Sequence, residues 1–400
     1  MKRTVIVFDD ARVHASLLPL TFTRPVGALR CGIDTIAEKW GRLLNAEIAF
    51  NPSEDYLRPL FGAGAEILEA ADTLHVAGHV IPDPELAKAA DALQPGEALY
   101  ALTEEGEAPT LIARRGPVES SQKIYGEDDE EGVRAVTQLY HLFLMNGGTI
   151  CSDFEALTAG RRSQALPEDN TVIGDAGLVF IEEGAEVHGC FINTTGGPVY
   201  FGKDSTAMEG SMLRGPLALC EHSTVNMGTK IYPDTTIGPW CKVGGEINNV
   251  IFQAYSNKAH DGFLGNAVIG EWCNLGAGCV ASNLKNDYTP VKLWNYPSHR
   301  FLKTGLQFCG LIMGDHSKAG INTMFNTATV VGVGVNIHGA GFPRNFVASF
   351  TEGGHSGSDD VVMSRFFETA RRVMARRHVE LTPQMEQMLL AVREIAEQYK

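Results

Sequence analysis

The chain of 400 residues is long enough for two or three domains, and its composition, 44% hydrophobic and 20% charged, is that of a globular protein. The formal net charge of −15 argues against nucleic acid or an anionic membrane as the main partner, because both require a basic protein face. Acidic residues from Asp9 onward leave no room for a signal-peptide core, and no apolar run reaches the length of a membrane span. The eight cysteines include no CxxC pair, so we expect structural, reduced thiols in a cytoplasmic protein.

Residues 1–120 alternate predicted strands with predicted helices, which is typical of an α/β domain built on a mainly parallel sheet. Strands are expected at residues 3–8, 46–50, 73–78, 97–102 and 110–114, and helices at about 29–40 and 84–93. Residues 121–165 are expected to form a helical linker, with an acidic loop (GEDDEEG) and helices near 130–145 and 152–160.

A period of six dominates residues 166–350. Aliphatic residues recur six apart without a break, and mostly small residues follow four positions after each: Phe201, Ala207, Leu213, Leu219, Val225, Ile231, Ile237 and Val243. A helix repeats its apolar face every 3.6 residues and a strand every two, so neither explains this period. Short flat strands joined by corners at fixed offsets do explain it. The pattern predicts a hexapeptide-repeat parallel β-helix, which we expect in its left-handed form.

Two interruptions of the period are the places where such a solenoid is expected to keep its chemistry, residues 249–262 and 282–310. Beyond the solenoid, residues 351–400 are expected to be helical. Pro383 is a suitable first-turn residue for the last helix, after the possible cap Thr382.

Five polar residues in and around these interruptions are candidates for a site. His260 lies in a polar loop and is suited to act as a general base, or else it is a surface histidine that orders its loop. Asn274 and Asn283 are either turn formers or ligands of a sugar hydroxyl. Lys230 and Lys258 are suited to bind a phosphate, although lysines on a solenoid face are usually only solvated.

The first interruption resembles the catalytic coil region of the bifunctional N-acetylglucosamine-1-phosphate uridylyltransferase/glucosamine-1-phosphate acetyltransferase family. The family pattern K-A-G-H-x-x-Y-L-G-D, followed by N-x-G-A-G and a further Asn, stands here as Lys258-Ala259-His260, Phe263-Leu264-Gly265-Asn266, Asn274-Leu275-Gly276-Ala277-Gly278 and Asn283. By this resemblance His260 is the base that deprotonates the sugar amine, Asn274 and Asn283 line the sugar site, and the region of Ala277 and Gly278 meets acetyl-CoA. Two differences are that Phe263 replaces a tyrosine and that the glycine before the histidine is absent.

The N-terminal region resembles the sugar-nucleotidyltransferase half of the same family more loosely, through Leu18-Pro19-Leu20-Thr21 and Arg24-Pro25. The glycine-rich loop is replaced by FDDARVHAS, Val26 stands at the place of a lysine, and His79 stands at the place of a magnesium-binding aspartate. Phosphoryl transfer depends on positioning and charge neutralisation by these missing groups. A different nucleotide site would be built from Asp9, Asp10, Arg24 and Arg30; no metal site is predicted, and Mg²⁺ is required only if this domain is active.

The resemblance therefore implies an acetyl-CoA-dependent N-acetyltransferase acting on an amino-sugar phosphate of the glucosamine-1-phosphate type, in the synthesis of nucleotide-sugar and cell-envelope precursors. One alternative is a bifunctional enzyme that also forms the nucleotide sugar from a nucleoside triphosphate, as a UDP-N-acetylglucosamine diphosphorylase does. Another is a non-catalytic sugar-nucleotide-binding protein. Hexapeptide-repeat acyltransferases resembling this chain are trimers with sites shared between neighbouring coils, so we expect a homotrimer.

Overall fold

The computed structural model describes residues 2–102, 109–118, 121–125 and 132–400, so the expected acidic loop lies almost entirely outside the described residues. It divides into two compact units. The first unit comprises Met1–Leu17, Thr23–Leu29 and Asp34–His141, and the second comprises Leu18–Phe22, Arg30–Ile33 and Leu142–Lys400. Two short N-terminal segments are thus part of the second unit, although the sequence predicts one N-terminal domain over residues 1–120.

The first unit contains a six-stranded mixed sheet in the order β2-β1-β3-β5-β4-β6. Its strands are β1 (Thr4–Phe8), β2 (Glu47–Asn51), β3 (Leu74–Ala77), β4 (Glu97–Ala101), β5 (Thr110–Arg115) and β6 (Ser121–Tyr125). The central strand β1 is parallel to β2 and β3, whereas β5 is antiparallel to β3 and β4. The expected parallel arrangement is therefore found around β1 and not across the whole sheet.

Short helices connect these strands: α1 (Ala11–Ser16), η1 (Val26–Ala28), α2 (Ile36–Leu43), η2 (Asp55–Leu57), α3 (Arg58–Phe61), α4 (Ala65–Leu68) and α5 (Pro84–Asp91). Helix α2 begins later than the sequence pattern suggests because Thr35 caps it. The Thr35 hydroxyl accepts from the Glu38 N–H (3.2 Å), and the Glu38 carboxylate accepts from the Thr35 N–H (2.7 Å). This reciprocal capping box fixes the first turn.

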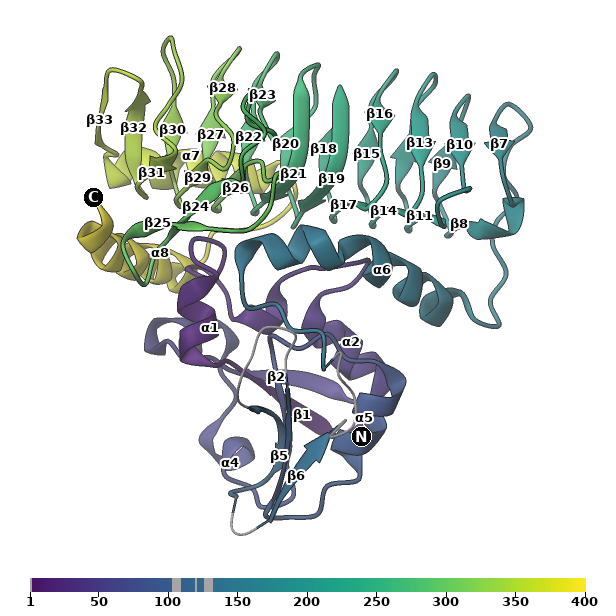
Figure 1. The fold of residues 1–400 in the computed structure, drawn as a ribbon, viewed down its shortest axis with the longest axis vertical. Helices are drawn as coiled ribbons and strands as arrows, with labels where there is room; N and C mark the ends of the chain where they lie inside the picture. Colours follow the sequence, from purple (N-terminus) through teal and green to yellow (C-terminus); the bar gives the residue numbers. More distant parts are fainter. Residues whose placement is uncertain (1, 103–108, 119–120, 126–131) are drawn as a thin grey trace. The chain divides into compact units, whose positions relative to one another are not determined.

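The second unit is dominated by a left-handed parallel β-helix, whose coils stack in order from β7 to β33 (Figure 1). Three faces run along it. The first face contains β7 (Thr171–Ile173), β10 (Phe191–Asn193), β13 (Met212–Arg214), β16 (Lys230–Ile231), the first halves of β19 (Glu246–Phe252) and β21 (Phe263–Ile269), β23 (Val280–Ala281) and β28 (Met324–Phe325). The second face contains β8 (Val179–Ile181), β11 (Val199–Phe201), β14 (Leu217–Leu219), β17 (Thr235–Ile237), the second halves of β19 and β21, β26 (Ile312–Met313), β29 (Val330–Val331) and β31 (Phe346–Val347). The short helix η3 (Ala176–Leu178) comes directly before β8.

The third face contains β9 (Glu186–Val187), β12 (Thr206–Ala207), β15 (Thr224–Val225), β18 (Lys242–Val243), β20 (Asn257–Lys258), β22 (Asn274–Leu275), β27 (Lys318–Ala319), β30 (Asn336–Ile337), β32 (Thr351–Gly354) and the antiparallel β33 (Gly357–Asp360). The aliphatic residues of the six-residue period point into the coil, and Val225, Ile237 and Val243 are fully buried there. Burial of each such side chain contributes about 1.5–3 kcal/mol. The predicted hexapeptide solenoid is confirmed.

The two interruptions of the period differ in kind. The first does not leave the solenoid: Val243 pairs with Lys258, and Asn257 pairs with Asn274, so the third face continues through it. The second does leave the coil and contains the antiparallel hairpin of β24 (Lys292–Asn295) and β25 (Arg300–Lys303). Only the second interruption is therefore an excursion of the chain.

Residues 139–158 form the single helix α6 (Leu139–Thr158), so the expectation of separate helices near 130–145 and 152–160 is wrong. A glycine pair lies inside this helix. A Cβ atom at Gly147 would lie 1.9 Å from the Asp234 carboxylate, so the glycine allows the helix to approach the solenoid closely. The Asn146 side chain donates to the Asp234 carbonyl (2.8 Å) at the same point.

The C-terminal helices α7 (Met363–Ala375) and α8 (Pro383–Ala396), followed by η4 (Glu397–Tyr399), contact several of the later coils of their own solenoid. Phe366 lies between His316 and Phe350, with ring centroids 5.7 and 5.4 Å away, over the corner that holds Gly334. The Thr382 hydroxyl accepts from the Met385 N–H (3.3 Å), which confirms the predicted cap of α8. None of the described helices combines the length and apolar character needed to cross a bilayer.

The segment Arg30–Ile33 is fastened to the second face of the solenoid. The Arg30 N–H donates to the Gln253 side-chain oxygen (2.7 Å), and the Gln253 amide donates back to the Arg30 carbonyl (3.1 Å). Next to this pair, the Gly32 N–H donates to the Asn146 side chain (2.7 Å). Because Gln253 is buried, its truncation would remove two hydrogen bonds at a site shielded from water.

We therefore expect Gln253→Ala to lower the free energy of unfolding of the second unit by about 2 kcal/mol, as two buried polar groups lose their partner. Denaturant titration followed by circular dichroism measures this loss. The exposed Gln307, whose amide donates to the Tyr288 carbonyl (3.0 Å), gives the matched control Gln307→Ala, for which the loss is expected to stay below about 0.5 kcal/mol. Equal losses in both variants would contradict a fastening role for Gln253.

Candidate functional site

His260 lies at the corner that leads from the third face of the solenoid into the first, and its side chain is exposed. The corner of the next coil lies directly beside it, because the Gly278 N–H donates to the Asp261 carbonyl (3.0 Å). Asn274 is exposed on the third face of that next coil. The structure thus brings four predicted residues, His260, Asn274, Ala277 and Gly278, onto two adjacent coils.

Lys258 lies inside the coil and not on its surface. It occupies the interior position that Val243 occupies one coil earlier, and only 1% of it is exposed. Its ammonium donates to the carbonyls of His260 (2.7 Å) and Gly244 (3.1 Å), and burial lowers its pKa to about 8. The expectation that Lys258 binds a substrate phosphate does not agree with this geometry, because the ammonium faces backbone carbonyls within the core.

Asn283 lies at the opposite edge of the first face from His260. Its side-chain amide donates to the Asn266 side-chain oxygen (2.8 Å), at the bend in β21 where the first face ends. Lys230 is exposed on the same face, two strands away from β21. Within one chain, the predicted residues are therefore divided between the two edges of the first face.

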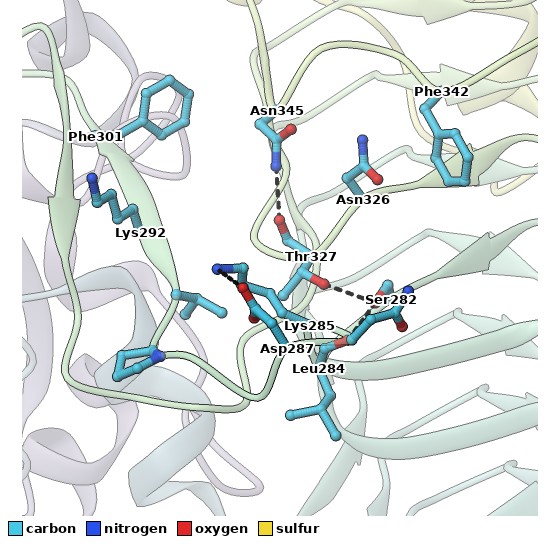
Figure 2. Close-up of a pocket in the computed structure, with 13 residues that line it drawn as sticks. Ser282, Leu284, Lys285, Asp287, Lys292, Phe301, Asn326, Thr327, Phe342 and Asn345 are labelled. Atoms are coloured by element: carbon cyan, nitrogen blue, oxygen red, sulfur yellow. Dashed lines mark hydrogen bonds and ion pairs between the residues drawn. The ribbon is translucent and has the colours of Figure 1, made fainter.

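A cavity of about 1060 Å³ lies next to Asn283, between the excursion hairpin and the solenoid. Figure 2 shows Phe301 and Lys292 of the hairpin on one side and Asn326, Asn345 and Phe342 of the solenoid on the other. The lining combines two lysines, several amide and hydroxyl groups and an apolar wall: Ser282, Leu284, Lys285, Asn286, Asp287, Pro290, Val291, Lys292, Phe301, Asn326, Thr327, Phe342 and Asn345. A volume of this size is typical of small-molecule sites, and the many polar and charged groups of its lining suit a polar ligand.

Hydrogen bonds and ion pairs already order part of this lining. The hydroxyls of Ser282 and Thr327 lie 2.8 Å apart, and the Asn345 amide donates to the Thr327 carbonyl (2.8 Å) (Figure 2). Lys285 lies 3.4 Å from the Asp287 carboxylate, so one of the two lysines is partly neutralised. The Lys292 ammonium and the polar end of Asn326 are therefore the groups best placed to recognise an anionic or hydroxyl-rich ligand.

Aromatic packing holds the hairpin that forms the outer wall of the cavity. Trp294 stacks on Phe346 of the solenoid, with ring centroids 4.2 Å apart. Tyr296 packs edge-on against Phe22 (5.5 Å) and Tyr399 (4.8 Å), which belong to the two ends of the chain. The wall is thus anchored by segments that are far apart in the sequence, so the interrupted period at residues 282–310 predicts an excursion but not the cavity that it encloses.

The four N-terminal candidates are occupied by structural contacts. The Asp9 carboxylate is fully buried and lies between His14 Nδ1 (3.1 Å) and the Val26 N–H (2.9 Å). Asp10 caps α1; burial raises its pKa, but hydrogen bonds from the Val13 and Arg12 N–H groups outweigh this effect and lower the pKa overall. Arg24 is buried, and Arg30 belongs to the second unit, where it contacts Gln253.

The residues present do not fit the Mg²⁺ ion that the resemblance to nucleotidyltransferases implies. His79, at the place of the metal-binding aspartate, is 1% exposed, and neither ring nitrogen has a hydrogen-bond partner. Burial lowers its pKa to about 4, so the imidazole is neutral at pH 7, whereas Mg²⁺ prefers carboxylate oxygens. Across the described part of the chain, no three His, Cys, Asp or Glu side chains are placed to hold a metal ion.

This mismatch predicts that UTP and Mg²⁺ together raise the melting temperature by no more than UTP alone. The reason is that a ligand stabilises a protein only through its affinity for the folded state, and the donors for the metal are missing. Differential scanning fluorimetry with millimolar UTP, with Mg²⁺ or with a chelator, measures the effect. A Mg²⁺-dependent rise in the melting temperature would contradict the prediction.

Comparisons with known proteins give a family match near the N-terminus and partial likenesses to curated proteins. Residues 5–162 match the family model described as sugar nucleotidyl transferase. Among curated proteins, the bifunctional protein GlmU of Methanocaldococcus jannaschii is 33% identical over 118 residues, which is 30% of this chain and 26% of that protein. GlmU of Gloeobacter violaceus is 36% identical over 64 residues, 16% of this chain and 14% of that protein.

GlmU of Methanococcus aeolicus is 32% identical over 104 residues, 26% of this chain and 25% of that protein, so each alignment spans about a quarter or less of the relative. A solved structure of the UDP-N-acetylglucosamine acyltransferase of Arabidopsis covers 59% of this chain and 91% of its own, with 15% identity. Its TM-score of 0.21 is too low to support a conclusion. The chain is a divergent relative of the bifunctional GlmU proteins, with a sugar nucleotidyl transferase match near its N-terminus and a left-handed β-helix after it.

Proposed function

We propose that the solenoid transfers an acetyl group from acetyl-CoA to the amine of an amino-sugar phosphate of the glucosamine-1-phosphate type, in the synthesis of nucleotide-sugar or cell-envelope precursors. The observation that carries the proposal is the exposed His260 on a fixed corner, beside Asn274 and the glycine-containing corner of Ala277 and Gly278. The likeness to bifunctional GlmU proteins supports the same class of reaction.

In the proposed reaction His260 takes one proton from the sugar ammonium. The freed electron pair of the nitrogen attacks the thioester carbonyl, and backbone N–H groups at the corner stabilise the resulting oxyanion. Collapse of this intermediate breaks the carbon–sulfur bond; the nitrogen loses its second proton, and the leaving CoA thiolate takes that proton up. The products are the N-acetylated sugar phosphate and free CoA, with no covalent enzyme intermediate.

The site is proposed to be shared between neighbouring copies of the chain in a homotrimer. His260 and Asn283 lie at opposite edges of the first face, so a neighbouring copy is needed to bring them together. The outward-facing side chains of the first face, between these two edges, are partly apolar: Phe191, Met212, Val280 and Met324 are exposed. A C3 assembly would cover these side chains and join the corner of His260 to the cavity beside Asn283 of the next copy.

The cavity is proposed to hold the sugar phosphate, with Lys292 facing the phosphate and the amides of Asn326 and Asn345 facing the hydroxyls. Acetyl-CoA is proposed to lie along the corner of Ala277 and Gly278. The direct test is release of CoA thiol from acetyl-CoA with glucosamine-1-phosphate as acceptor. N-acetylglucosamine-1-phosphate, which lacks the free amine, is the control acceptor. The proposal fails if a panel of amino-sugar phosphates releases no thiol with a folded protein.

The match of residues 5–162 to sugar nucleotidyl transferases favours one second candidate, a bifunctional enzyme that also forms the nucleotide sugar. The environment of His79 argues against a metal-dependent version of that activity. A sugar-nucleotide-binding role without turnover is the remaining alternative for this half of the chain. A cytoplasmic location stays a prediction that fits these substrates.

A further inference from the structure

Corner carbonyls of the solenoid accept hydrogen bonds, and at several corners an inward hydroxyl is the donor. This hydroxyl belongs to the small residue four positions after the aliphatic one. Three threonine hydroxyls show the pattern, each donating to the backbone carbonyl three residues earlier: Thr229 to Asn226 (2.5 Å), Thr323 to Gly320 (2.8 Å) and Thr351 to Ala348 (2.7 Å).

The corner of His260 has no such hydroxyl. The fourth position after Lys258 is Gly262, and a Cβ atom there would lie 2.0 Å from the Cys279 carbonyl. No side chain can therefore stand at this position without moving the neighbouring coil. The preceding corner, Gly244 and Gly245, is also formed without an inward hydroxyl, because the fourth position after the buried Val243 is the buried Ile247.

Two other side chains hold these carbonyls. The Lys258 ammonium reaches from the interior of the coil and donates to His260 (2.7 Å) and Gly244 (3.1 Å), which joins two successive corners. The Asn226 amide donates to the Ala259 carbonyl (2.8 Å) from the other side. The carbonyls of residues 259 and 260 each accept a hydrogen bond from a side chain. The two bonded carbonyls lie directly before and after the Cα atom that carries the His260 ring.

We propose that Lys258 and Asn226 form an internal brace that positions His260, so that Lys258 acts in catalysis without touching substrate. This inference rests on the proposed function. Because burial leaves the Lys258 pKa at about 8, the amine is mostly protonated at pH 7 and donates strongly to both carbonyls. Loss of the brace would leave the His260 imidazole chemically intact but free to turn away from the acceptor amine. The effect therefore falls on kcat and not on substrate binding.

Steady-state kinetics of Lys258→Met and Asn226→Ala test the brace. Each variant is expected to lower kcat for acetyl transfer about ten- to a hundredfold, since misplacement of a catalytic group by about 1 Å has such an effect. KM for both substrates stays within about twofold. The double variant is expected to be no worse than Lys258→Met alone, because both residues act on one corner. Lys258→Arg, which keeps the donors, restores part of kcat.

The matched control is Val187→Ala, which removes core volume from the same interior column four coils away. It is expected to lower stability with little change in kcat. If Lys258→Met does not fold, the kcat of Asn226→Ala is compared with that of the wild type and Val187→Ala instead. A kcat that stays at the wild-type value, or a loss of kcat that Val187→Ala reproduces, overturns the positioning role.

Hydrogen–deuterium exchange separates the brace from the proposed function. Amides in the peptide of residues 258–264 are expected to exchange at least about tenfold faster in Lys258→Met than in the wild type or Val187→Ala. Unchanged exchange in this peptide overturns the brace, whether or not the protein transfers acetyl groups. Faster exchange in Lys258→Met, together with no acetyl transfer by the wild-type protein, would leave the brace standing and reject the proposed function alone.

Discussion

Replacement of His260 by alanine is expected to lower kcat for acetyl transfer at least about a hundredfold, which is the usual contribution of a positioned general base. The amine would then have to lose its proton to water before attack. Binding of acetyl-CoA should change little, because its proposed contacts lie at Ala277 and Gly278. Comparison of kcat and KM by thiol release, for the wild type and His260→Ala, measures the effect.

His338→Ala is the matched control for this substitution. His338 is likewise an exposed histidine at the corner after a third-face strand, and it has no proposed role in the reaction. The control is expected to keep the wild-type kcat. Retention of more than about a tenth of the wild-type kcat in His260→Ala would show that another group, or water, serves as the base.

Mixing two inactive variants is expected to restore activity if each site is shared between copies. His260→Ala and Asn283→Ala are each expected to be at least about tenfold impaired alone, since one removes the base and the other a ligand of the sugar. In each hybrid trimer, which contains both variants, about one interface in three would combine an intact His260 with an intact Asn283 from the neighbouring copy.

Coexpression of the two variants with different affinity tags, followed by tandem purification, isolates such hybrids. Their specific activity should approach about a third of the wild-type value. A mixture of separately purified homotrimers, not allowed to exchange subunits, is the control and should remain inactive. Hybrids no more active than the single variants would place both residues in the site of one copy, and a monomeric wild type would reject sharing altogether.

The solenoid was predictable because its period is local: each coil repeats the same inward positions, so Val225, Ile231 and Ile237 identify the core without any knowledge of the structure. The corner of His260, Asn274, Ala277 and Gly278 followed from position and from resemblance, and the structure places these residues on adjacent coils. Local patterns of this kind were enough for the architecture and for one edge of the candidate site.

The prediction of a surface position for Lys258 is wrong because the six-residue period changes one coil earlier. The step from Val243 to Ile247 is shorter than six residues, so the sequence no longer indicates which residue points inward. A lysine is also normally expected at the surface, and only the unpaired carbonyls of two corners explain its burial. The role of Lys258 follows from its hydrogen bonds to the carbonyls of Gly244 and His260, which no periodic pattern in the sequence predicts.

The cavity and the fastening of Arg30 depend on residues that are distant in the sequence. Arg30 and Gln253 are 223 positions apart, and nothing in either local sequence indicates the other. The cavity similarly combines the hairpin at Lys292 with corner residues such as Asn345, which sequence reasoning treats as ordinary turn formers. Contacts between residues so far apart in the sequence leave no local pattern. The parts of the site that depend on such contacts are therefore the parts that the sequence does not predict.

The most direct measurement is nuclear magnetic resonance of the reaction of wild-type protein with carbon-13-labelled acetyl-CoA and glucosamine-1-phosphate. We predict that the acetyl signal moves from the thioester to an amide on the sugar nitrogen, at a rate proportional to protein concentration and lost in His260→Ala. An acetyl signal that stays on CoA, with folded protein and with each of several amino-sugar phosphates, would contradict the acetyltransferase account.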